Sequence, residues 1–521
     1  MKFGFCANLP ERCEKAARKE KIMMIGPEPR CPRCGVGLIE VPRTFDRRRL
    51  ALLVIGWLAL AAVLGALIVG RPHSASEKPA AAAPAPEYLL RLSGSNTIGA
   101  VLVPRLVDAW LVSLGATGVT LEQRRDAAGA LIPEMVVKGK LGERSVAVEV
   151  RAHGSANAFI HLLDGSADIG MASRPVNTSE KEKLLKVMGD MTSRNSEHII
   201  GLDGIAVIVA PGNPIDRIAI GELARIFRGE VTDWSQIGAG NGPIRVYARD
   251  AQSGTYDTFK ALVIKEGALV ADARRYEDTE QLESAVAQDA GAIGFVGLPY
   301  VKAAKSLLVS DGVNTLALAP TVITVKKEDY ALSRRLYLYT ASNPGKPVIR
   351  DFVNFIQTNR GQDVVKAVGF VDQIIDDFNQ PKRTRASASA RPCQLSAEWP
   401  GSRNAYCDSV ASKSDIGTTF RFIIGSDKLD NRANEDVQRL LRVLAEHPAG
   451  RLTLIGFSDN TGSYARNLEL SNARAIAVKT ALRSVGIEAV DAIAFGQELP
   501  VADNGTNSGR ERNRRVEVWV N

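Results

Sequence analysis

Residues 87–97 read EYLLRLSGSNT, and this stretch sets the pattern for the largest part of the chain. Its apolar run ends in a Gly/Ser turn, which opens onto residues 100–114 (AVLVPRLVDAWLVSL), where apolar residues have helical spacing. The same order of strand, turn and helix returns at residues 146–165 and 205–229. This repetition predicts an α/β fold with parallel strands.

Three of the turns carry similar residues, at 93–97, 153–155 and 253–255. Ligands collect at the C-terminal ends of parallel strands, and each turn offers hydroxyls and free backbone N–H groups at the start of a helix. Arg249 precedes the third turn and can add a guanidinium. One such turn alone is more often a helix N-cap. Three on one sheet, together with the arginine, predict an anion-binding site.

The motifs that follow one another from residue 93 to residue 300 resemble the type 2 periplasmic binding proteins, and among them the phosphate-binding proteins of ABC importers. The resemblance covers residues 88–379 and implies two α/β lobes, joined by crossover strands, that close on phosphate or a similar oxyanion. The motifs are SGSNTIG, HGSANAF, LLDGSADIGMASRP, IAVIVAPGNP, ELARIFRGEVTDWSQI, ARDAQSGTYDTF and AIGFVGLPY.

The resemblance also implies which residues hold the anion. The candidates are Ser95, Thr97 and Ile98 in the first turn, Ser155 in the second, Ser173 and Arg174 after a further strand, and Arg249, Ser253, Gly254 and Thr255 in the third.

This chain departs from the family pattern at two positions and carries extra sequence. Residues 172–175 read ASRP, where phosphate binders usually place an aspartate that accepts the proton of hydrogen phosphate. Without that acceptor, selection for a protonated oxyanion weakens, so the site is looser or tuned to another anion. Gln252 replaces the usual glycine of the third turn, and residues 116–149 have the composition of an insertion.

From residue 416 the chain alternates strands and helices in a pattern that predicts a two-layer α/β sandwich. Asp459 ends one strand, and Arg474 lies in the following helix. Such a carboxylate and guanidinium suit a ligand that carries both an ammonium and a carboxylate. The alternative is a surface salt bridge of about 0–1 kcal/mol.

The C-terminal motifs resemble the OmpA-like peptidoglycan-binding domain over its whole length. The resemblance implies that Asp459 and Arg474 hold the diaminopimelate of the peptidoglycan stem peptide. The residues that carry it are GFSDNTGS (456–463), Asn467, LSNARA (470–475), Gly496, Pro500, Asn504, Gly509 and NRRVE (513–517).

Residues 50–70 form an uncharged apolar run of 21 residues, long enough to cross a bilayer as a helix. Four arginines precede it between residues 43 and 49, whereas only Arg71 and Lys78 follow closely. The positive-inside rule therefore predicts a single-pass inner-membrane protein with a cytoplasmic N-terminus and a periplasmic bulk. A cleaved signal peptide is the alternative.

The net charge of +8 is concentrated before this run. The first 49 residues hold 12 Lys and Arg against 6 Asp and Glu, which accounts for +6 of it. A nucleic-acid binder carries its basic residues on a folded domain. We therefore expect no nucleic-acid partner.

Four cysteines lie on the predicted cytoplasmic side. Cys31 and Cys34 have the two-residue spacing of a zinc knuckle, and Cys6 and Cys13 would complete a zinc ribbon with structural zinc. Six residues separate Cys6 from Cys13, which is more than a knuckle usually has. One zinc knuckle beside unrelated cysteines is therefore the alternative.

The two remaining cysteines, Cys393 and Cys407, lie on the predicted exported side, where a disulfide between them is expected. Low-complexity stretches around residues 72–87 and 380–390 indicate spacers. The predicted organisation is 1–45 zinc ribbon, 50–70 transmembrane helix, 71–87 linker, 88–379 binding domain, 380–415 linker with the disulfide, and 416–521 OmpA-like domain.

These features predict a non-enzymatic envelope protein that binds an oxyanion for uptake or sensing and grips peptidoglycan. An ABC permease or a cytoplasmic signalling partner would suit such a protein. The alternative is a structural tether whose binding fold has lost its ligand and acts as a protein-interaction module. No HExxH or GxSxG motif indicates an enzyme, and His153 beside Ser155 is the nearest candidate.

Overall fold

The computed structural model divides the chain into two compact units, Met1–Ala83 and Pro84–Asn521. Within the described residues, no helix has both the length and the apolar character needed to cross a membrane. The predicted span at 50–70 lies outside them. The structure describes residues 3–6, 22–23, 31, 38–40, 85–251, 253–312, 315–375, 400–422, 426–446, 451–488 and 490–520.

The first unit contains a small antiparallel sheet. Its central strand is β1 (Phe3–Cys6), which pairs with β2 (Ile22–Met23) on one side and β3 (Leu38–Glu40) on the other. Cys6 is the last residue of β1, and Cys31 is buried.

The other two predicted zinc ligands, Cys13 and Cys34, lie outside the described residues. In the part of the chain that the structure describes, no group of three or more His, Cys, Asp or Glu side chains could hold a metal ion. Zinc binding therefore stays a prediction.

The first lobe of the second unit has the predicted parallel core. Strand β4 (Glu87–Gly94) lies between β7 (Arg144–Ala152) and β8 (Ile169–Ala172) and is parallel to both. In the core, Trp110 meets Phe352 edge-on, with ring centroids 5.2 Å apart. The helices of this lobe are α3 (Asn96–Gly99), α4 (Leu102–Ser113), α5 (Ser155–Leu163), α6 (Thr178–Met188), α11 (Pro347–Ile356) and α12 (Asn359–Ala367).

The predicted insertion at 116–149 extends this sheet. Strands β5 (Thr117–Arg125) and β6 (Leu131–Leu141) form an antiparallel hairpin, and β6 pairs with β7. Strand β5 is the last strand of the sheet, and most of its side chains are exposed. Its charged residues fit that position, because they discourage further strand pairing.

The second lobe repeats the parallel arrangement. Strand β11 (Arg245–Arg249) lies between β12 (Arg274–Tyr276) and β13 (Ala292–Gly297). Phe259 stacks on Phe295 in its core, with centroids 3.9 Å apart. The other elements are β10 (Arg217–Ala219), α7 (Ile220–Phe227), α8 (Gly254–Phe259), α9 (Thr279–Gln288), β14 (Lys305–Ser306), β15 (Leu308–Ser310) and α10 (Val322–Lys326).

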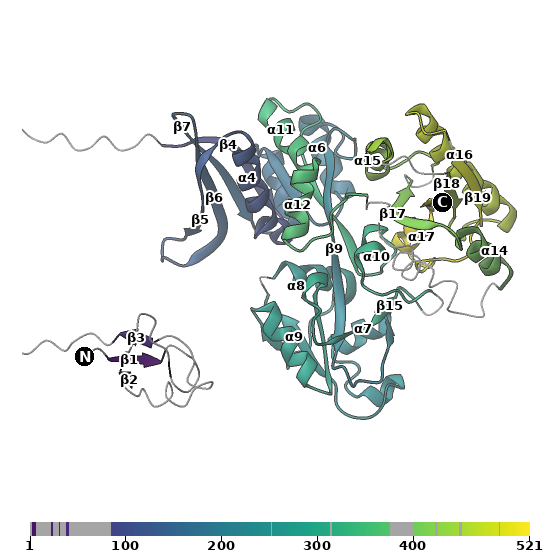
Figure 1. Ribbon diagram of the computed structural model, residues 1–521, viewed down its shortest axis with the longest axis horizontal. Coiled ribbons are helices and arrows are strands. Elements are labelled where there is room, and N and C mark those ends of the chain that lie inside the picture. Colours follow the sequence, from purple (N-terminus) through teal and green to yellow (C-terminus); the bar gives the residue numbers. More distant parts are fainter. Residues whose placement is uncertain are drawn as a thin grey trace, which may run out of the picture. The chain divides into compact units, whose positions relative to one another are not determined.

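Two long strands join the lobes. The first part of β9 (Glu197–Val209) pairs with β16 (Ser333–Tyr339), and its last five residues pair with β13 of the second lobe. Strand β16 also pairs with β8 of the first lobe. Figure 1 shows β9 running from one lobe into the other. The predicted two-lobed α/β fold with crossover strands is therefore confirmed.

The C-terminal domain is a four-stranded sheet in the order β17-β20-β18-β19. Alternate residues of a strand face opposite sides, and here both sides are covered. Leu454 belongs to the core beneath α15 and α16, whereas Ile455 packs with Tyr406 of α14. The elements are α14 (Pro400–Val410), β17 (Ser414–Arg421), α15 (Asn431–Glu446), β18 (Leu452–Gly456), α16 (Tyr464–Ser484), β19 (Val490–Ala494), α17 (Asn507–Asn513) and β20 (Arg515–Val520).

The expected two-layer sandwich thus has a helix on its second face as well. Helix α14 lies within the stretch predicted as a linker, and its Tyr406 and Val410 are buried. The physical reason is that Ile455 and Trp519 would otherwise leave an apolar face in water. Cys407 of α14 is disulfide-bonded, and its predicted partner Cys393 lies outside the described residues.

Candidate functional site

The first two predicted loops meet within the first lobe. Strand β4 ends at Gly94, and the buried Ser95 donates its backbone N–H to the carbonyl of Met171 at 2.8 Å. Ser155 starts α5, and its hydroxyl oxygen accepts the backbone N–H of Ser173 at 3.1 Å. The structure therefore brings Ser155 and Ser173 together.

The third loop comes from the second lobe and contacts the first loop directly. Ser253 is the N-cap of α8, where its hydroxyl accepts the N–H of Tyr256 at 3.5 Å. The Thr97 hydroxyl of the first loop donates to the carbonyl of Gly254 at 3.1 Å. Two candidate loops from different lobes are thus joined.

Arg249, the predicted anion clamp, is occupied by its own lobe. Its side chain is 15% exposed. The guanidinium donates to the carbonyls of Tyr276 at 3.2 Å and Glu277 at 2.8 Å, and to the hydroxyl of Thr279. In this conformation, Arg249 fixes the segment between β12 and α9.

Arg174 is also held by local contacts. Its two terminal nitrogens bind both carboxylate oxygens of Glu180 at 2.9 and 2.7 Å, and the guanidinium carbon lies 5.3 Å from the ring centre of Phe159. Glu180 is in turn part of the capping box that starts α6. The structure gives Arg174 a local role at this helix start and shows no contact between its guanidinium and another candidate.

A different arginine, Arg334 of β16, contacts the first and third loops. The sequence motifs did not indicate this residue. Its Nη2 donates to the Thr97 hydroxyl at 2.7 Å and to the carbonyl of Gly254 at 3.3 Å. Its Nε lies 3.4 Å from a carboxylate oxygen of Asp203. Burial lowers the pKa of Arg334, while the nearby Asp203 carboxylate opposes that shift.

Two carboxyl groups border the same point, and sequence reasoning missed both. Asp203 of β9 also accepts the hydroxyl of Thr258 at 3.0 Å. Asp257 of α8 accepts the side-chain amide of Asn96 at 3.3 Å, and burial raises the pKa of Asp257. The amide oxygen of Asn96 is buried and has no hydrogen-bond partner among the described residues. Polar groups of both lobes therefore converge around Thr97 and Gly254.

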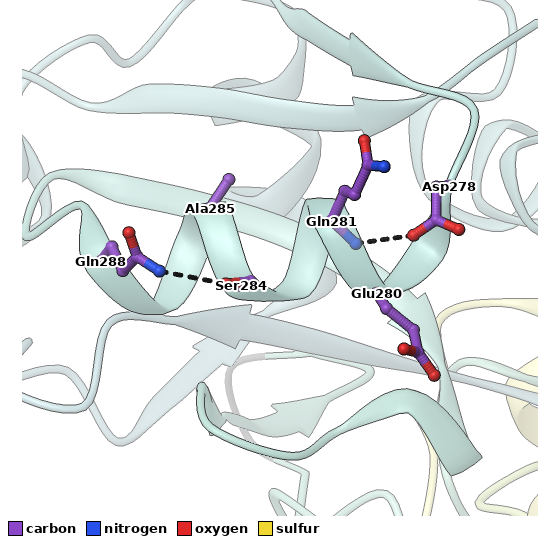
Figure 2. Close-up of a pocket in the computed structure, with 6 residues that line it drawn as sticks. All are labelled: Asp278, Glu280, Gln281, Ser284, Ala285 and Gln288. Atoms are coloured by element: carbon purple, nitrogen blue, oxygen red, sulfur yellow. Dashed lines mark hydrogen bonds between the residues drawn. The ribbon is translucent and has the colours of Figure 1, made fainter. Parts of the chain in front are cut away.

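A surface pocket on α9 lies apart from this convergence. Its volume is about 560 Å³, and Figure 2 shows its lining, in which Asp278 accepts the backbone N–H of Gln281 at 2.7 Å. Asp278 and Glu280 give it a negative character that disfavours an anion. The lining residues are Asp278, Glu280, Gln281, Ser284, Ala285 and Gln288, none of them a predicted ligand.

The second predicted site lies in the C-terminal domain. Asp459 follows β18, and its carboxylate accepts the guanidinium of Arg514 and the backbone N–H of Thr461, both at 2.8 Å. The Nε of Arg474 is buried and has no hydrogen-bond partner within the described residues. Burial and the Arg514 charge lower the pKa of Arg474, and Asp459 opposes them. Arg514, which the NRRVE motif contains, is therefore a further residue of this site.

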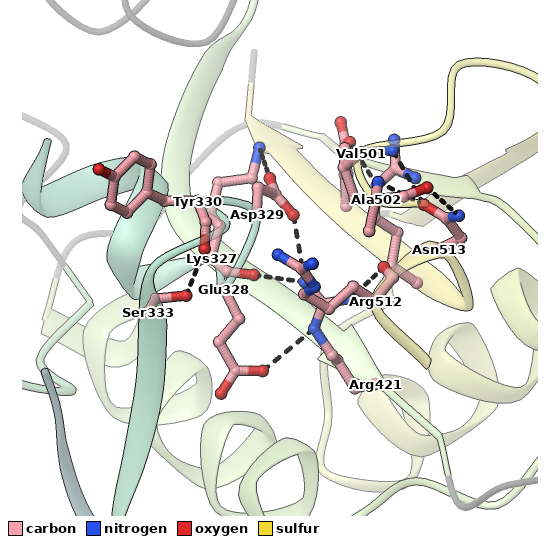
Figure 3. Close-up of polar contacts among 12 residues, drawn as sticks. Lys327, Glu328, Asp329, Tyr330, Ser333, Arg421, Val501, Ala502, Arg512 and Asn513 are labelled. Atoms are coloured by element: carbon pink, nitrogen blue, oxygen red, sulfur yellow. Dashed lines mark hydrogen bonds and ion pairs between the residues drawn. The ribbon is translucent and has the colours of Figure 1, made fainter. Parts of the chain in front are cut away.

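The C-terminal domain is held against the binding fold by residues 327–330, which we name the docking loop. Glu328 binds Arg335 of its own fold at 2.9 Å, Arg421 of the C-terminal domain at 3.1 Å and Arg432 of that domain at 2.9 Å. Lys327 reaches Asp415 at 2.7 Å. Figure 3 shows Arg421 directed into the docking loop.

Comparison with known proteins follows the same division of the chain. A PBP superfamily domain matches residues 141–360, and the OmpA family matches residues 421–514. Protein SphX of Synechococcus elongatus is 33% identical over 239 residues, which cover 44% of this chain and 69% of SphX. The phosphate-binding protein PstS of Staphylococcus saprophyticus is 28% identical over 261 residues, 48% of this chain and 79% of that protein.

Solved structures give matches to both parts. An ABC-type phosphate transport receptor from Vibrio cholerae is 22% identical with a TM-score of 0.40, over 54% of this chain and 99% of the receptor. The peptidoglycan-associated lipoprotein of Burkholderia pseudomallei is 27% identical with a TM-score of 0.19, over 20% of this chain and 89% of the lipoprotein.

A two-lobed fold with polar loops converging from both lobes defines a solute-binding protein rather than an enzyme. The chain belongs to the family of SphX, with a match to the PBP superfamily domain at residues 141–360 and to the OmpA family at residues 421–514.

Proposed function

We propose that the chain binds phosphate or a related oxyanion between its two lobes, for uptake or sensing. The observation that carries this proposal is the meeting of Thr97, Gly254 and Arg334, which brings hydroxyl, backbone and guanidinium groups of both lobes to one point. Charge-assisted hydrogen bonds of this kind are the strong ones in oxyanion recognition. The phosphate-binding proteins among the relatives support the same ligand class.

The test is isothermal titration of the full chain with inorganic phosphate, sulfate and small carboxylates. We expect Thr97→Val to weaken phosphate binding about tenfold, because it removes the hydroxyl that Arg334 contacts. Thr120→Val, at an exposed position of β5, is the matched control and should bind like the wild type. Absence of heat with every anion would overturn the proposal.

The C-terminal domain is proposed to attach the protein to peptidoglycan. The Nε of the buried Arg474 has no hydrogen-bond partner in the described part of the chain, and the Asp459 carboxylate acts on its charge. This carboxylate and guanidinium suit the ammonium and carboxylate of a diaminopimelate centre. Asp459→Asn and Arg474→Lys should each reduce co-sedimentation with purified diaminopimelate-type peptidoglycan. Asp491→Asn, an exposed member of an ion pair with Arg451, serves as the control. Undiminished sedimentation of both site variants would contradict the assignment.

The N-terminal part is proposed to anchor the protein in the inner membrane through residues 50–70, with a structural zinc held by the cysteines before it. The uncharged length of the run and the arginines that precede it support the anchor. Membrane fractionation with N-terminal sequencing separates a retained anchor from a cleaved signal, and metal analysis of the full chain tests the zinc. An ABC permease or a cytoplasmic signalling protein is the proposed partner.

A structural tether is the second candidate function. It is favoured by residues 172–175, which lack the family's aspartate. It is also favoured by Arg249, whose guanidinium donates hydrogen bonds to residues of its own lobe. On this proposal the binding fold serves as a protein-contact module. Peptidoglycan binding without oxyanion binding is the result that would favour it.

A further inference from the structure

Arg334 lies on a crossing strand, at the point where residues of both lobes meet. Strand β16 pairs with β9, which continues into the second lobe, and with β8 of the first lobe. From this strand the guanidinium reaches Thr97 of the first lobe and Gly254 of the second. A single side chain thus contacts both lobes.

The positive charge of Arg334 faces two carboxyl groups but is held by one direct contact. Its side chain is 10% exposed, its ion pair is with Asp203 at 3.4 Å, and the Asp257 carboxylate acts with Asp203 to raise the pKa of Arg334. Asp203 shares its charge, because the same carboxylate oxygen accepts the hydroxyl of Thr258 at 3.0 Å. A largely buried charge is costly unless paired closely. The pair with Asp203 involves Nε, whereas Nη2 is directed at Thr97 and Gly254, where it would meet an oxyanion bound beside Thr97.

The two arginines that the sequence predicted as anion ligands are more fully engaged. Arg174 is bound through two hydrogen bonds by Glu180, and Arg249 donates to two carbonyls and the Thr279 hydroxyl. Neither guanidinium contacts a candidate residue of the other lobe. Arg334 alone among these three arginines does so.

We infer that Arg334 is an oxyanion-binding residue of the cleft, whose guanidinium binds the anion and ties the loops of Thr97 and Gly254 around it. This inference rests on the proposed oxyanion binding and adds the residue that supplies the charge. It also gives β16 a direct part in binding the anion. One side chain would both neutralise the charge of the anion and hold the two lobes together around it.

The neighbouring residue provides a stringent control. Successive residues of a strand face opposite sides, and Arg335 binds Glu328 of the docking loop and Asp430 of the C-terminal domain instead of the cleft. Its side chain is 15% exposed, close to the 10% of Arg334. Loss of Arg335 should therefore lower stability through a similar burial effect without removing a contact to the anion.

The experiment compares Arg334→Lys, Arg334→Gln and Arg335→Gln in the full chain, titrated with inorganic phosphate. We expect phosphate affinity to fall about tenfold in Arg334→Lys, which keeps the charge but loses the planar set of donors, and about a hundredfold in Arg334→Gln. Arg335→Gln should keep the wild-type affinity. The rise in Tm on adding phosphate is the second readout, because it reports ligand binding to the folded state.

A merely structural role would lower the Tm of the Arg334 variants and leave their phosphate-induced rise in Tm unchanged. That result, or wild-type affinity in Arg334→Lys, would overturn the inference while the proposed function stood. If Arg334→Gln does not fold, the Arg334→Lys variant decides. If the wild type binds no oxyanion at all, the proposed function and the inference both fall.

Discussion

Gly254 shows how closely the two lobes approach at the scale of a single residue. A Cβ atom built on it would lie 2.5 Å from the Cα of Thr97 and 2.9 Å from its hydroxyl oxygen. Real Cβ atoms do not come so near to a backbone atom, and the backbone cannot swing aside as a flexible side chain can. The absence of a side chain here lets the loops of both lobes share hydrogen bonds.

Gly254→Ala should therefore separate the first and third loops. We expect phosphate affinity to fall about tenfold or more, because the loops must shift to relieve the overlap. Titration of the full chain with phosphate measures this effect. Gly221→Ala is the control, since a Cβ there meets no atom within 4 Å. Equal affinity of Gly254→Ala and wild type would show that the ligand does not require this approach.

His198 is a buried histidine that makes stability depend on pH. Burial lowers its pKa from 6.5 to about 4, although Glu435 of α15 acts to raise it. The unfolded chain binds the proton more readily than the folded one. The contribution of neutral His198 to the free energy of unfolding is therefore fully present above pH 6.5 and is lost as the pH falls towards 4. The difference corresponds to about 3 kcal/mol in the free energy of unfolding.

His198→Gln should lose less stability than the wild type between pH 7 and pH 4.5, because it lacks the buried imidazole that takes up a proton. Denaturant unfolding at the two pH values measures the difference. His153→Gln, at an exposed position, is the control and should follow the wild type. An identical loss in His198→Gln and wild type would show that this imidazole does not carry the effect.

At the scale of elements, α9 holds the segment that leads into β14. The buried carboxylate of Glu283 accepts the backbone N–H groups of Lys302, Ala303 and Ala304 at 3.0, 2.6 and 2.7 Å. One side chain therefore satisfies three consecutive donors outside regular structure. This contact stabilises the second lobe, which also carries the third loop.

Glu283→Gln should weaken this attachment by about 1–3 kcal/mol, because a neutral amide replaces a charged acceptor. Amide hydrogen exchange at residues 302–304 should accelerate more than exchange elsewhere in the lobe. Glu280→Gln is the control, since Glu280 pairs with the exposed Lys302 side chain at 2.7 Å on the surface. Unchanged exchange at 302–304 would contradict the expected role of Glu283.

At the scale of the whole molecule, the docking loop makes the binding fold and the C-terminal domain one compact unit. Glu328 adopts a left-handed φ of 60°, which is unfavourable for a residue with a side chain and is maintained by its surroundings. Burial alone would raise the pKa of Glu328, but Arg335, Arg432 and Arg421 outweigh it and hold this pKa well below its usual range.

Glu328→Gln should destabilise the docked unit by about 3–5 kcal/mol, because it leaves buried arginines without their shared counter-charge. Calorimetry should then show the C-terminal domain unfolding at a lower temperature than the binding fold. Since the folded pKa is depressed, the contribution of Glu328 is present above its usual pKa of 4.5 and is lost as the pH falls below it.

The control for docking is Glu435→Gln, which breaks an exposed ion pair with Arg194 between the same two domains, at 2.7 Å. Such surface pairs contribute about 0–1 kcal/mol, so the calorimetric profile should be nearly that of the wild type. A Glu328 variant that matches this control would show that the docking loop does not hold the domains together.

Both folds and most of the loops could be predicted from the amino-acid sequence, because turns, caps and apolar spacing are local signals. The strand and turn at residues 87–97 became β4 and its loop, and the alternation of strands and helices from residue 416 became the sheet and helices of the C-terminal domain. The helix α14, which falls within a predicted linker, was missed, because its burial depends on Ile455 and Trp519 far along the chain.

Which charged groups contact one another could not be predicted from the sequence. Arg334 and Thr97 are 237 residues apart, and Arg421 and Glu328 are 93 apart, so no local pattern connects them. In the same way, Arg249 and Arg174 have the residue type for an anion site, but neighbours in the fold occupy their donors. Residue identity sets what a side chain can bind, whereas the packing of distant strands determines which partner it reaches.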